Sequence, residues 1–422
     1  MIFCPLKAAE SSSIAWIEKE KVWTYRELGE LADFWTKNLE EKGVKPLSRI
    51  AVLSPPTPAL VALFFAAWRL GVGVCPLNTR LPKPALQKMV QNVNADLYLD
   101  AYEDPSLFFP KTGCKTSLSK IDPLLPALYL ATSGSTAEPK IAVLTLQNLL
   151  KNAEGAIPLL DLREQDAWLL QLPLFHVGGI GILIRSILAR AIIVTDPSYS
   201  NITHISCIPT HLYRASPVYK KLRCVLVGGA PITECPTYLP IIATYGLTEM
   251  GSMVLAQSAP SDGYLGHALP YRKVKVAEDG EIWVGGECLF QGYLERETIA
   301  PPGEWFATKD LGELDPTLGI KILGRKDWQF ISGGENIQPE EIEQHMMQIP
   351  GIQEVAVVPK DDPEFGKRPV AFIKGHIELK RLREILSLKL PKYKIPIDVI
   401  SLQQMPRLGI KIDRKSLIHA IS

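Results

Sequence analysis

Short apolar runs alternate with longer stretches of helical spacing through most of the chain. The runs Arg49–Leu53, Ala191–Val194 and Cys224–Val227 are apolar and largely β-branched, a composition typical of buried strands. Between such runs, Tyr25–Leu39 and Leu60–Leu70 carry apolar residues at helical spacing. Strands that alternate with helices of this length predict an α/β fold built on parallel sheets.

The hydrophobic pattern changes near residue 273. Lys273–Val276 and Glu281–Val284 each alternate polar and apolar residues, and Asp279-Gly280 lies between them. Asp-Gly is a common turn of two-residue β-hairpins. We therefore expect the parallel sheet to give way to antiparallel structure here.

A domain boundary is predicted around Gly324–Asp327, giving an N-terminal domain of residues 1–324 and a C-terminal domain of residues 325–422. Beyond the boundary the pattern predicts a complete small set of elements. These are a loop at Ser332–Gly334, a helix at Pro339–Met347, strands at Val355–Val358 and Val370–Ile373, a helix near Leu379–Leu388 and a basic tail. Roughly a hundred residues is a normal size for a small domain.

Length and composition narrow the function classes. A chain of 422 residues exceeds what one core usually supports, so a ligand site between domains is expected. Lys and Arg number 46 against 45 Asp and Glu, a formal charge of +1, which gives no long-range field for nucleic acid or a membrane surface. Any phosphate recognition must therefore be local.

The cysteines and the apolar segments indicate a cytoplasmic protein. Seven scattered cysteines form no CxxC pair, which disfavours a zinc site and a disulfide framework. The residues after Met1 show no signal-peptide pattern, and the apolar run Pro58–Trp68 has 11 residues, too few to span a bilayer. The sequence leaves a homo-oligomer open.

Thr132–Lys140 is the segment with the strongest chemical signal. It follows the apolar run Ala127–Ala131, contains Gly134 among several hydroxyl residues, and ends on a lysine. Glycine lets backbone N–H groups converge on an anion, while hydroxyls and a lysine add donors and charge. The spacing differs from that of the Walker loop. For the loop alone, a solvated polar turn is an equally good interpretation.

Further segments add nucleotide-handling chemistry. Gly228-Gly229-Ala230 ends a predicted strand, where backbone can approach a flat ligand closely. Tyr245–Glu249 places an aromatic ring, a hydroxyl and a carboxylate together, and Mg²⁺ needs few protein carboxylates because phosphates and water supply its other ligands. Asp310 lies at a turn where a carboxylate could hold ribose hydroxyls. Lys411 lies in a glycine-containing tail loop, where a plain solubilising charge is the ordinary alternative.

Together, six such motifs in this order resemble the acyl-adenylate-forming superfamily, which includes acyl-CoA synthetases, peptide-synthetase adenylation domains and firefly luciferase. The resemblance covers essentially the whole chain. It implies a large N-terminal domain of sheets and helices and a small mobile α+β C-terminal domain that swings about a hinge. It also implies ATP, Mg²⁺ and the co-substrate CoA.

The resemblance implies a role for each matching residue. Residues expected to bind ATP are Thr132, Ser133, Gly134, Ser135, Thr136, Lys140, Gly229, Ala230, Tyr245, Thr248, Asp310, Arg325 and Lys411. Residues expected to take part in catalysis are Lys411, Thr248 and Glu249, with Glu249 holding Mg²⁺. Asp327 corresponds to the hinge, and Ser332, Gly333 and Gly334 to the loop beside the CoA channel.

The acid that is activated is indicated by Arg185, which interrupts the apolar run Ile180–Ile187. A buried guanidinium is costly unless an anion meets it, and a substrate carboxylate would serve. From the residue alone, a structural ion pair is at least as good an explanation. The segments around His176, Arg185 and Ser206 resemble the o-succinylbenzoate–CoA ligase branch of the superfamily, which implies that these three residues line the acid pocket.

The resemblance therefore implies an AMP-forming acid–thiol ligase. It would convert 2-succinylbenzoate, ATP and CoA to 2-succinylbenzoyl-CoA, AMP and pyrophosphate through an acyl-adenylate. A CoA ligase for another aromatic acid and a stand-alone adenylation enzyme that loads a carrier protein are the nearest alternatives. A catalytically silent nucleotide-binding protein is a third, against which the presence of Glu249, Asp310 and Lys411 argues.

Overall fold

The computed structural model describes residues 2–8, 12–104, 120–132, 139–207, 221–229, 239–258, 263–408 and 411–421. The helices of this part are α1 (Pro5–Ala8), α2 (Tyr25–Glu41), α3 (Pro58–Arg69), α4 (Lys83–Val93), α5 (Leu146–Leu160), α6 (Val177–Ala189), α8 (Pro339–Met347), α9 (Leu379–Leu386) and α10 (Arg414–His419). Short 3₁₀ turns are η2 (Thr248–Met250), η3 (Lys326–Trp328) and η4 (Lys392–Lys394).

Two large mixed sheets form most of the fold before residue 260. The strand order of the seven-stranded sheet is β19 (Thr298–Ala300), β18 (Gly292–Glu295), β9 (Lys140–Thr145), β8 (Pro126–Thr132), β5 (Gly73–Pro76), β4 (Arg49–Leu53) and β6 (Leu97–Asp100). The order of the eight-stranded sheet is β15 (Ser252–Ser258), β14 (Ile241–Leu247), β13 (Cys224–Val227), β12 (His204–Cys207), β10 (Ala167–Leu169), β11 (Ile192–Val194), β2 (Ile14–Glu18) and β3 (Lys21–Thr24). A small pair, β1 (Ile2–Phe3) and β7 (Lys120–Ile121), lies apart from both.

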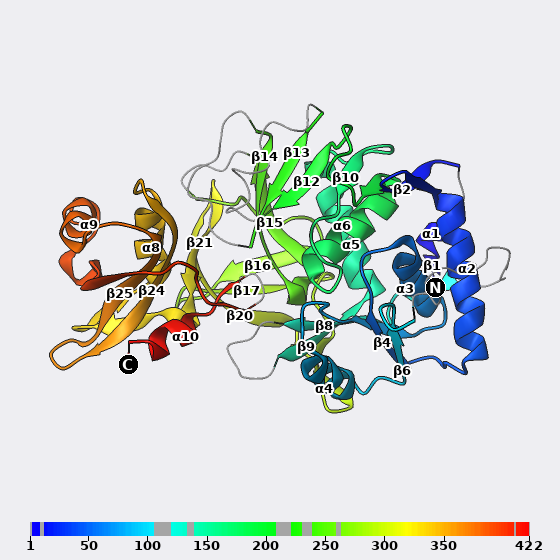
Figure 1. Cartoon of the computed structure of the whole chain (residues 1–422), viewed down its shortest axis with the longest axis horizontal. Coiled ribbons are helices and arrows are strands. Elements are labelled where there is room, and N and C mark those ends of the chain that lie inside the picture. Colours follow the sequence, from blue (N-terminus) through cyan, green and yellow to red (C-terminus); the bar gives the residue numbers. More distant parts are fainter. Residues whose placement is uncertain are drawn as a thin grey trace.

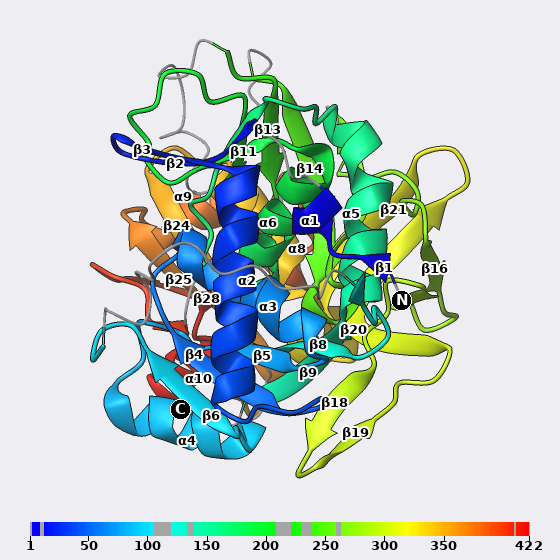
Figure 2. The ribbon, with the colours of Figure 1, turned by 90° about the vertical axis from the view of Figure 1, so that its right-hand side faces the viewer.

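The predicted α/β architecture is confirmed, with parallel strands in the middle of each large sheet. Antiparallel strands complete the sheets at their ends, as where β9 pairs with β8 and β15 with β14. Helices lie between the two sheets in Figure 2. Strand β4 shows the layering, because Ile50 and Val52 pack into the large core with α2 and α3 while Ala51 and Leu53 pack on the opposite face with α4.

Local sequence explains where the two predicted inner helices begin. Thr24 caps α2 in a reciprocal capping box with Glu27. Helix α3 begins at Pro58, the first residue of the apolar run, because Thr57 accepts a hydrogen bond from the Leu60 amide and proline suits the first helical turn. All residues of α3 are buried, which accounts for its uninterrupted apolar sequence.

A four-stranded antiparallel sheet follows, in the order β16 (Arg272–Val276), β17 (Glu281–Gly286), β20 (Trp305–Asp315) and β21 (Gly319–Arg325). Strands β16 and β17 form the hairpin that the Asp-Gly turn predicted, with Gly280 at a positive φ of 79°. The predicted change from parallel to antiparallel structure is confirmed. Strands β20 and β21 carry the predicted nucleotide residues Asp310 and Arg325.

The elements after residue 325 gather at one end of the molecule (Figure 1). They are the β22 (Phe330–Ser332) and β23 (Glu335–Ile337) hairpin, the sheet β24 (Ile352–Asp362), β25 (Gly366–Gly375) and β26 (Asp398–Ser401), the β27 (Arg407–Leu408) and β28 (Lys411–Ile412) hairpin, and helices α8 to α10. Two apolar clusters formed by residues 330–421 pack among these elements.

Candidate functional site

The predicted phosphate loop connects two paired strands. Thr132 ends β8 and Lys140 begins β9, and the two residues face each other in the antiparallel register. The predicted residues Ser133, Gly134, Ser135 and Thr136 lie outside the described residues. The two described ends of the segment therefore lie on adjacent strands inside the seven-stranded sheet, and Lys140 is exposed at the start of β9.

Tyr293 contacts both Lys140 and Glu249. The Nζ atom of Lys140 lies 4.8 Å from the centroid of the Tyr293 ring. The Tyr293 hydroxyl donates a hydrogen bond of 2.5 Å to Oε1 of Glu249. Glu249 lies in the first turn of η2, directly after Thr248. The structure thus brings the predicted metal carboxylate and the phosphate-loop lysine onto opposite parts of one tyrosine.

Tyr245, Asp310 and Arg325 form a second group, built from β14, β20 and β21. The Tyr245 hydroxyl donates to Oδ2 of Asp310 at 2.5 Å, and Nη1 of Arg325 donates to Oδ1 at 3.0 Å. Burial, and then the charge of Asp310, raise the pKa of Tyr245 well above its usual value, so its hydroxyl stays a donor. Three of the residues expected to bind ATP are therefore joined by hydrogen bonds through Asp310.

Arg325 also reaches the predicted hinge. Its Nη2 atom donates to Oδ2 of Asp327 at 3.2 Å, and Nζ of Lys309 lies 3.6 Å from Oδ1 of the same carboxylate. Asp327 lies in η3, and Gly324 before it adopts a φ of 147°, where a Cβ would come within 2.4 Å of the Gln338 amide nitrogen. The backbone at this point accordingly requires glycine.

The Gly228-Gly229 segment follows β13 as predicted. Gly229 has a φ of 84°, and a Cβ on Gly228 would approach Thr244 Cγ2 to 2.8 Å. The strand end is thus packed closely against β14, just before Tyr245. Ala230, which is also expected to bind ATP, lies outside the described residues.

Arg185 is buried in α6, with 1% of its surface exposed. Its Nη2 atom donates to Oδ1 of Asn152 and to Oγ of Ser252, each at 3.1 Å, and its Nε has no hydrogen-bond partner within the described part of the chain. Among the described residues no carboxylate pairs with it. The structural ion pair that sequence reasoning left open is therefore not seen in this part of the chain.

A second buried guanidinium lies nearby. Arg272 donates to the carbonyl oxygens of Met253, Pro270 and Asn152. Burial, and then the positive charge of Arg272, lower the pKa of Arg185 to about 9. Asn152 accepts from both guanidiniums and is held by its own amide bonds to Met250 and Met253. These neutral groups solvate the cation without neutralising it.

His176 and Ser206, the other predicted acid-pocket residues, lie on neighbouring elements. His176 is the N-cap residue of α6, and its ring centroid lies 4.8 Å from that of Phe175. Ser206 is buried in β12 and its hydroxyl accepts a hydrogen bond from the Trp168 indole. Ser206 and Arg185 have different hydrogen-bond partners, so the structure does not join them in one bonded group.

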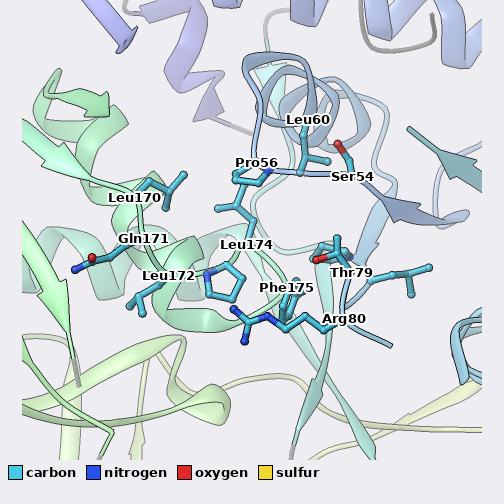
Figure 3. Close-up of a pocket in the computed structure, with 13 residues that line it drawn as sticks. Ser54, Pro56, Leu60, Thr79, Arg80, Leu170, Gln171, Leu172, Leu174 and Phe175 are labelled. Carbon is cyan, nitrogen blue, oxygen red and sulfur yellow. The ribbon is translucent and has the colours of Figure 1, made fainter. Parts of the chain in front are cut away.

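A cavity of about 210 Å³ opens next to these elements. Its walls come from the end of β4, the start of α3, the segment after β5 and the segment Leu170–Phe175. Figure 3 shows Arg80 extending beside Phe175, with Gln171 on the opposite side. Gln171 donates to the Ser206 carbonyl at 2.6 Å. The lining thus includes Phe175, the residue before His176, and Gln171, which is hydrogen-bonded to Ser206. His176 and Ser206 themselves do not line the cavity.

The predicted loop at Ser332–Gly334 is the turn of the β22–β23 hairpin, with Gly333 and Gly334 at φ values of 56° and 87°. The Gly333 amide donates to the Phe365 carbonyl, and a Cβ at Gly333 would meet the Phe365 ring at 2.9 Å. Lys411 begins β28 and pairs with Leu408 of β27. The position of its side chain is outside the described part of the structure.

Comparison with known proteins identifies the family. The sequence profile of the AMP-binding enzyme family matches residues 7–123 and 104–294, and that of the AMP-binding enzyme C-terminal domain matches residues 341–409. The chain belongs to the AMP-binding enzyme family. This enzyme is 33% identical to 2-succinylbenzoate–CoA ligase of Salmonella typhimurium, over 94% of this chain and 92% of that protein, and 34% identical to the Haemophilus influenzae ligase, over 90% and 88%.

Solved structures give the same picture for this AMP-binding enzyme. It is similar to o-succinylbenzoate CoA synthetase (MenE) from Bacillus subtilis in complex with the acyl-adenylate intermediate OSB-AMP, with a TM-score of 0.88, 26% identity and coverage of 99% of this chain and 98% of that one. The complex of the same synthetase with ATP and magnesium ion has a TM-score of 0.85 and 26% identity, covering 96% and 97%. Among the described residues, no helix is long and apolar enough to cross a bilayer.

Sequence reasoning missed three residues of these sites. Tyr293 lies in a short strand whose pattern carries no functional signal, and Asn152 and Ser252 read as ordinary polar residues of a helix and a strand. Ser252 does adopt an unusual φ of 136°, but backbone angles are not visible in the sequence. All three are found only through contacts with residues distant along the chain.

Proposed function

We propose that the chain is an AMP-forming 2-succinylbenzoate–CoA ligase, which converts 2-succinylbenzoate, ATP and CoA to 2-succinylbenzoyl-CoA, AMP and pyrophosphate. Relatives of that name share about a third of its residues over nearly the whole chain. The observation that supports this choice of substrate is the buried Arg185, which has no carboxylate partner in the described part of the structure.

A second carboxylate on the substrate accounts for this arginine. 2-Succinylbenzoate carries one carboxylate on its succinyl arm and one on its ring. If the succinyl carboxylate is activated, the ring carboxylate remains charged and needs a cation in the pocket. Arg185 is held by Asn152 and Ser252 and has no neutralising acid among the described residues, so it supplies one. A fatty-acid ligase would place an apolar side chain there instead.

The two groups of contacts support an ATP site in this region. We assign the phosphates to Thr132, Ser133, Gly134, Ser135, Thr136 and Lys140, and the α-phosphate also to Thr248. Adenine lies between the Gly229-Ala230 segment and the ring of Tyr245. Asp310 and Arg325 bind the ribose, and Ser206 and His176 line the acid pocket with Arg185.

The residues present fit a bound Mg²⁺. Among the described residues no group of three or more His, Cys, Asp or Glu side chains could hold a metal by itself. Mg²⁺ does not require one, because it is commonly held by one or two carboxylates plus phosphate oxygens and water. Glu249 is such a carboxylate, beside the phosphate-loop lysine. When bound there, Mg²⁺ offsets negative charge on the phosphates.

The reaction then has two halves. The succinyl carboxylate attacks the α-phosphorus of ATP, the bond to the β-phosphate oxygen breaks, and pyrophosphate leaves, with Lys411 stabilising charge that develops at the α-phosphate. The CoA thiolate next attacks the acyl carbonyl and AMP leaves as the second product. Both halves depend mainly on positioning and electrostatics.

Two conformations serve these halves. We propose that residues 1–324 form the nucleotide and acid domain and residues 325–422 a mobile domain that rotates at Asp327. Rotation withdraws Lys411 and brings Ser332, Gly333 and Gly334 toward the CoA channel, and such gating motions often limit turnover. The substrates are small and diffusible, and we place the enzyme in the cytoplasm, where its free cysteines Cys4, Cys75, Cys207, Cys224 and Cys288 stay reduced.

The first prediction tests the substrate directly. In ATP–pyrophosphate exchange across a panel of acids, 2-succinylbenzoate is expected to give the highest kcat/KM. 4-Oxo-4-phenylbutanoate, which keeps the succinyl arm but lacks the ring carboxylate, should fall behind by roughly 30-fold or more, the effect of losing one partner of a buried charge pair. Faster exchange with benzoate, with a long-chain fatty acid or with an amino acid would contradict the proposal.

A pH dependence follows from Arg185. Its pKa of about 9 in the free protein means that the cation is present below pH 9 and is lost as the pH rises through that value. The KM for 2-succinylbenzoate in pyrophosphate exchange is therefore expected to rise above pH 9. The KM for 4-oxo-4-phenylbutanoate should not follow the same curve, and identical curves for both acids would contradict the assignment.

A further inference from the structure

Tyr293 connects the two charged groups of the phosphate site. Its hydroxyl donates to Oε1 of Glu249 at 2.5 Å, and its ring lies under the ammonium of Lys140 at 4.8 Å. A hydrogen bond from a hydroxyl group fixes the orientation of a carboxylate, and the face of an aromatic ring attracts a nearby cation. One side chain therefore acts on the residue assigned to the metal and on the lysine assigned to the phosphates.

The surroundings hold Tyr293 rigidly in this place. In the β18–β9 pair, Tyr293 lies opposite Ala142. Ala142 follows Lys140 by two residues in β9. The rings of Phe290 and Phe306 meet it edge-on, at centroid distances of 5.0 Å and 6.2 Å. The Phe290 amide also donates to the Glu249 carbonyl at 2.8 Å. The segment Phe290–Tyr293 thus holds the backbone of Glu249 through Phe290 and its side chain through Tyr293.

The glycine before Tyr293 is required by this arrangement. Gly292 has a φ of 139°, and a Cβ there would lie 2.0 Å from the Ala300 carbonyl oxygen of the neighbouring strand β19. Any larger residue would push β18 away from β19. Close pairing of these strands at the sheet edge therefore helps to set the position of the tyrosine.

The Tyr293 hydroxyl bonds only one of the two oxygens of the Glu249 carboxylate. The bond occupies Oε1 of the carboxylate, so Oε2 is the oxygen that can turn toward a metal. Ordered outer partners of this kind commonly tune the affinity of a metal ligand.

We propose that Tyr293 is a positioning residue of the adenylation step, which orients Glu249 toward Mg²⁺ and holds Lys140 beside the phosphates that leave. This inference rests on the proposed function in assigning the metal to Glu249. It goes beyond that function because it names the residue that positions both Glu249 and Lys140.

The test compares Tyr293→Phe, which keeps the ring, with Tyr293→Leu, which loses ring and hydroxyl. The measurement is Mn²⁺ binding by electron paramagnetic resonance in the presence of α,β-methylene-ATP, which cannot react at the α-phosphate. Tyr293→Phe is expected to weaken Mn²⁺ binding about tenfold, the lower end of the usual effect of losing an outer partner. Binding of AMP without metal should stay unchanged. Tyr293→Leu should also raise the KM for pyrophosphate in the reverse reaction.

A matched control exists at another tyrosine. The Tyr264 hydroxyl donates to Oε1 of Glu313, and Lys321 lies 5.6 Å from its ring centroid, on the exposed side of the four-stranded sheet. Tyr264→Phe removes the same kind of bond and should leave Mn²⁺ affinity unchanged. It therefore separates loss of any tyrosine–carboxylate bond from loss of this one.

Glu249→Gln separates the inference about Tyr293 from the assignment of Mg²⁺ to Glu249. If Glu249→Gln weakens Mn²⁺ binding while Tyr293→Phe binds the metal as the wild type does, the inference about Tyr293 is wrong and the metal assignment stands. If Glu249→Gln leaves metal affinity unchanged, the proposed metal ligand itself is wrong. A lower melting temperature of Tyr293→Phe with wild-type metal affinity would mark the tyrosine as structural only.

Discussion

Replacing Lys411 by alanine is expected to slow formation of the acyl-adenylate by about 10² to 10³-fold, the usual cost of removing one donor that stabilises transition-state charge. Lys411 begins β28, whose partner strand β27 lies in the small C-terminal part of the chain. The measurement is ATP–pyrophosphate exchange at saturating 2-succinylbenzoate. Because the lysine acts on developing charge, kcat should fall much more than the KM for ATP rises.

The second half-reaction provides the control for this variant. Supplied 2-succinylbenzoyl-AMP should still react with CoA at close to the wild-type rate, because in the proposed mechanism the rotated domain carries Lys411 away from the site. Lys415→Ala, at an exposed lysine of α10 on the same tail, should leave both half-reactions intact. An equal loss of both half-reactions in Lys411→Ala would contradict the two-conformation mechanism.

Replacing Arg185 by alanine is expected to lower kcat/KM for 2-succinylbenzoate by roughly 30-fold or more, as truncating one partner of a buried charge pair does. The KM for ATP should stay within about twofold, since the side-chain hydrogen bonds of Arg185 in the described part of the structure go to Asn152 and Ser252, which are not assigned to the nucleotide. Activity toward 4-oxo-4-phenylbutanoate should change little. The variant would thus lose the preference between the two acids.

Arg185→Met controls for the volume that alanine removes. It fills most of the space with an apolar side chain, and the free protein should be at least as stable as the wild type, because no uncompensated charge remains buried. If both variants lose activity toward the two acids equally, or lose only thermal stability, Arg185 has a structural role instead.

Local signals were sufficient to predict several of the strands and helices. Strand β4 and helix α8 have the bounds expected from sequence, because a run of buried apolar residues marked the first and a proline followed by acidic residues marked the start of the second. The antiparallel ends of the large sheets were not predicted, because β9 and β15 pair through contacts that their own sequences do not specify. Hydrophobic pattern indicates burial and leaves strand direction open.

Some residues of the candidate site were likewise predicted from the sequence, and others were not. Tyr245, Asp310 and Arg325 were named from ordered motifs, and the structure brings them into contact. Tyr293 was not named, because its role depends on the pairing of β18 with β9 and on η2, which are far apart in sequence. Asn152 likewise acquires its role only where α5 packs against α6 and β15.

Arg325 binds Asp310 with one nitrogen and Asp327 with another. The carboxylate assigned to the ribose and the carboxylate assigned to the hinge therefore share one guanidinium. On the proposed mechanism, a nucleotide that draws Asp310 toward its hydroxyls would change how Arg325 divides its bonds, and would so bias the orientation of the mobile C-terminal domain. By reciprocity, the orientation of that domain would change the affinity for the nucleotide, so movement at Asp327 would help to set when AMP leaves.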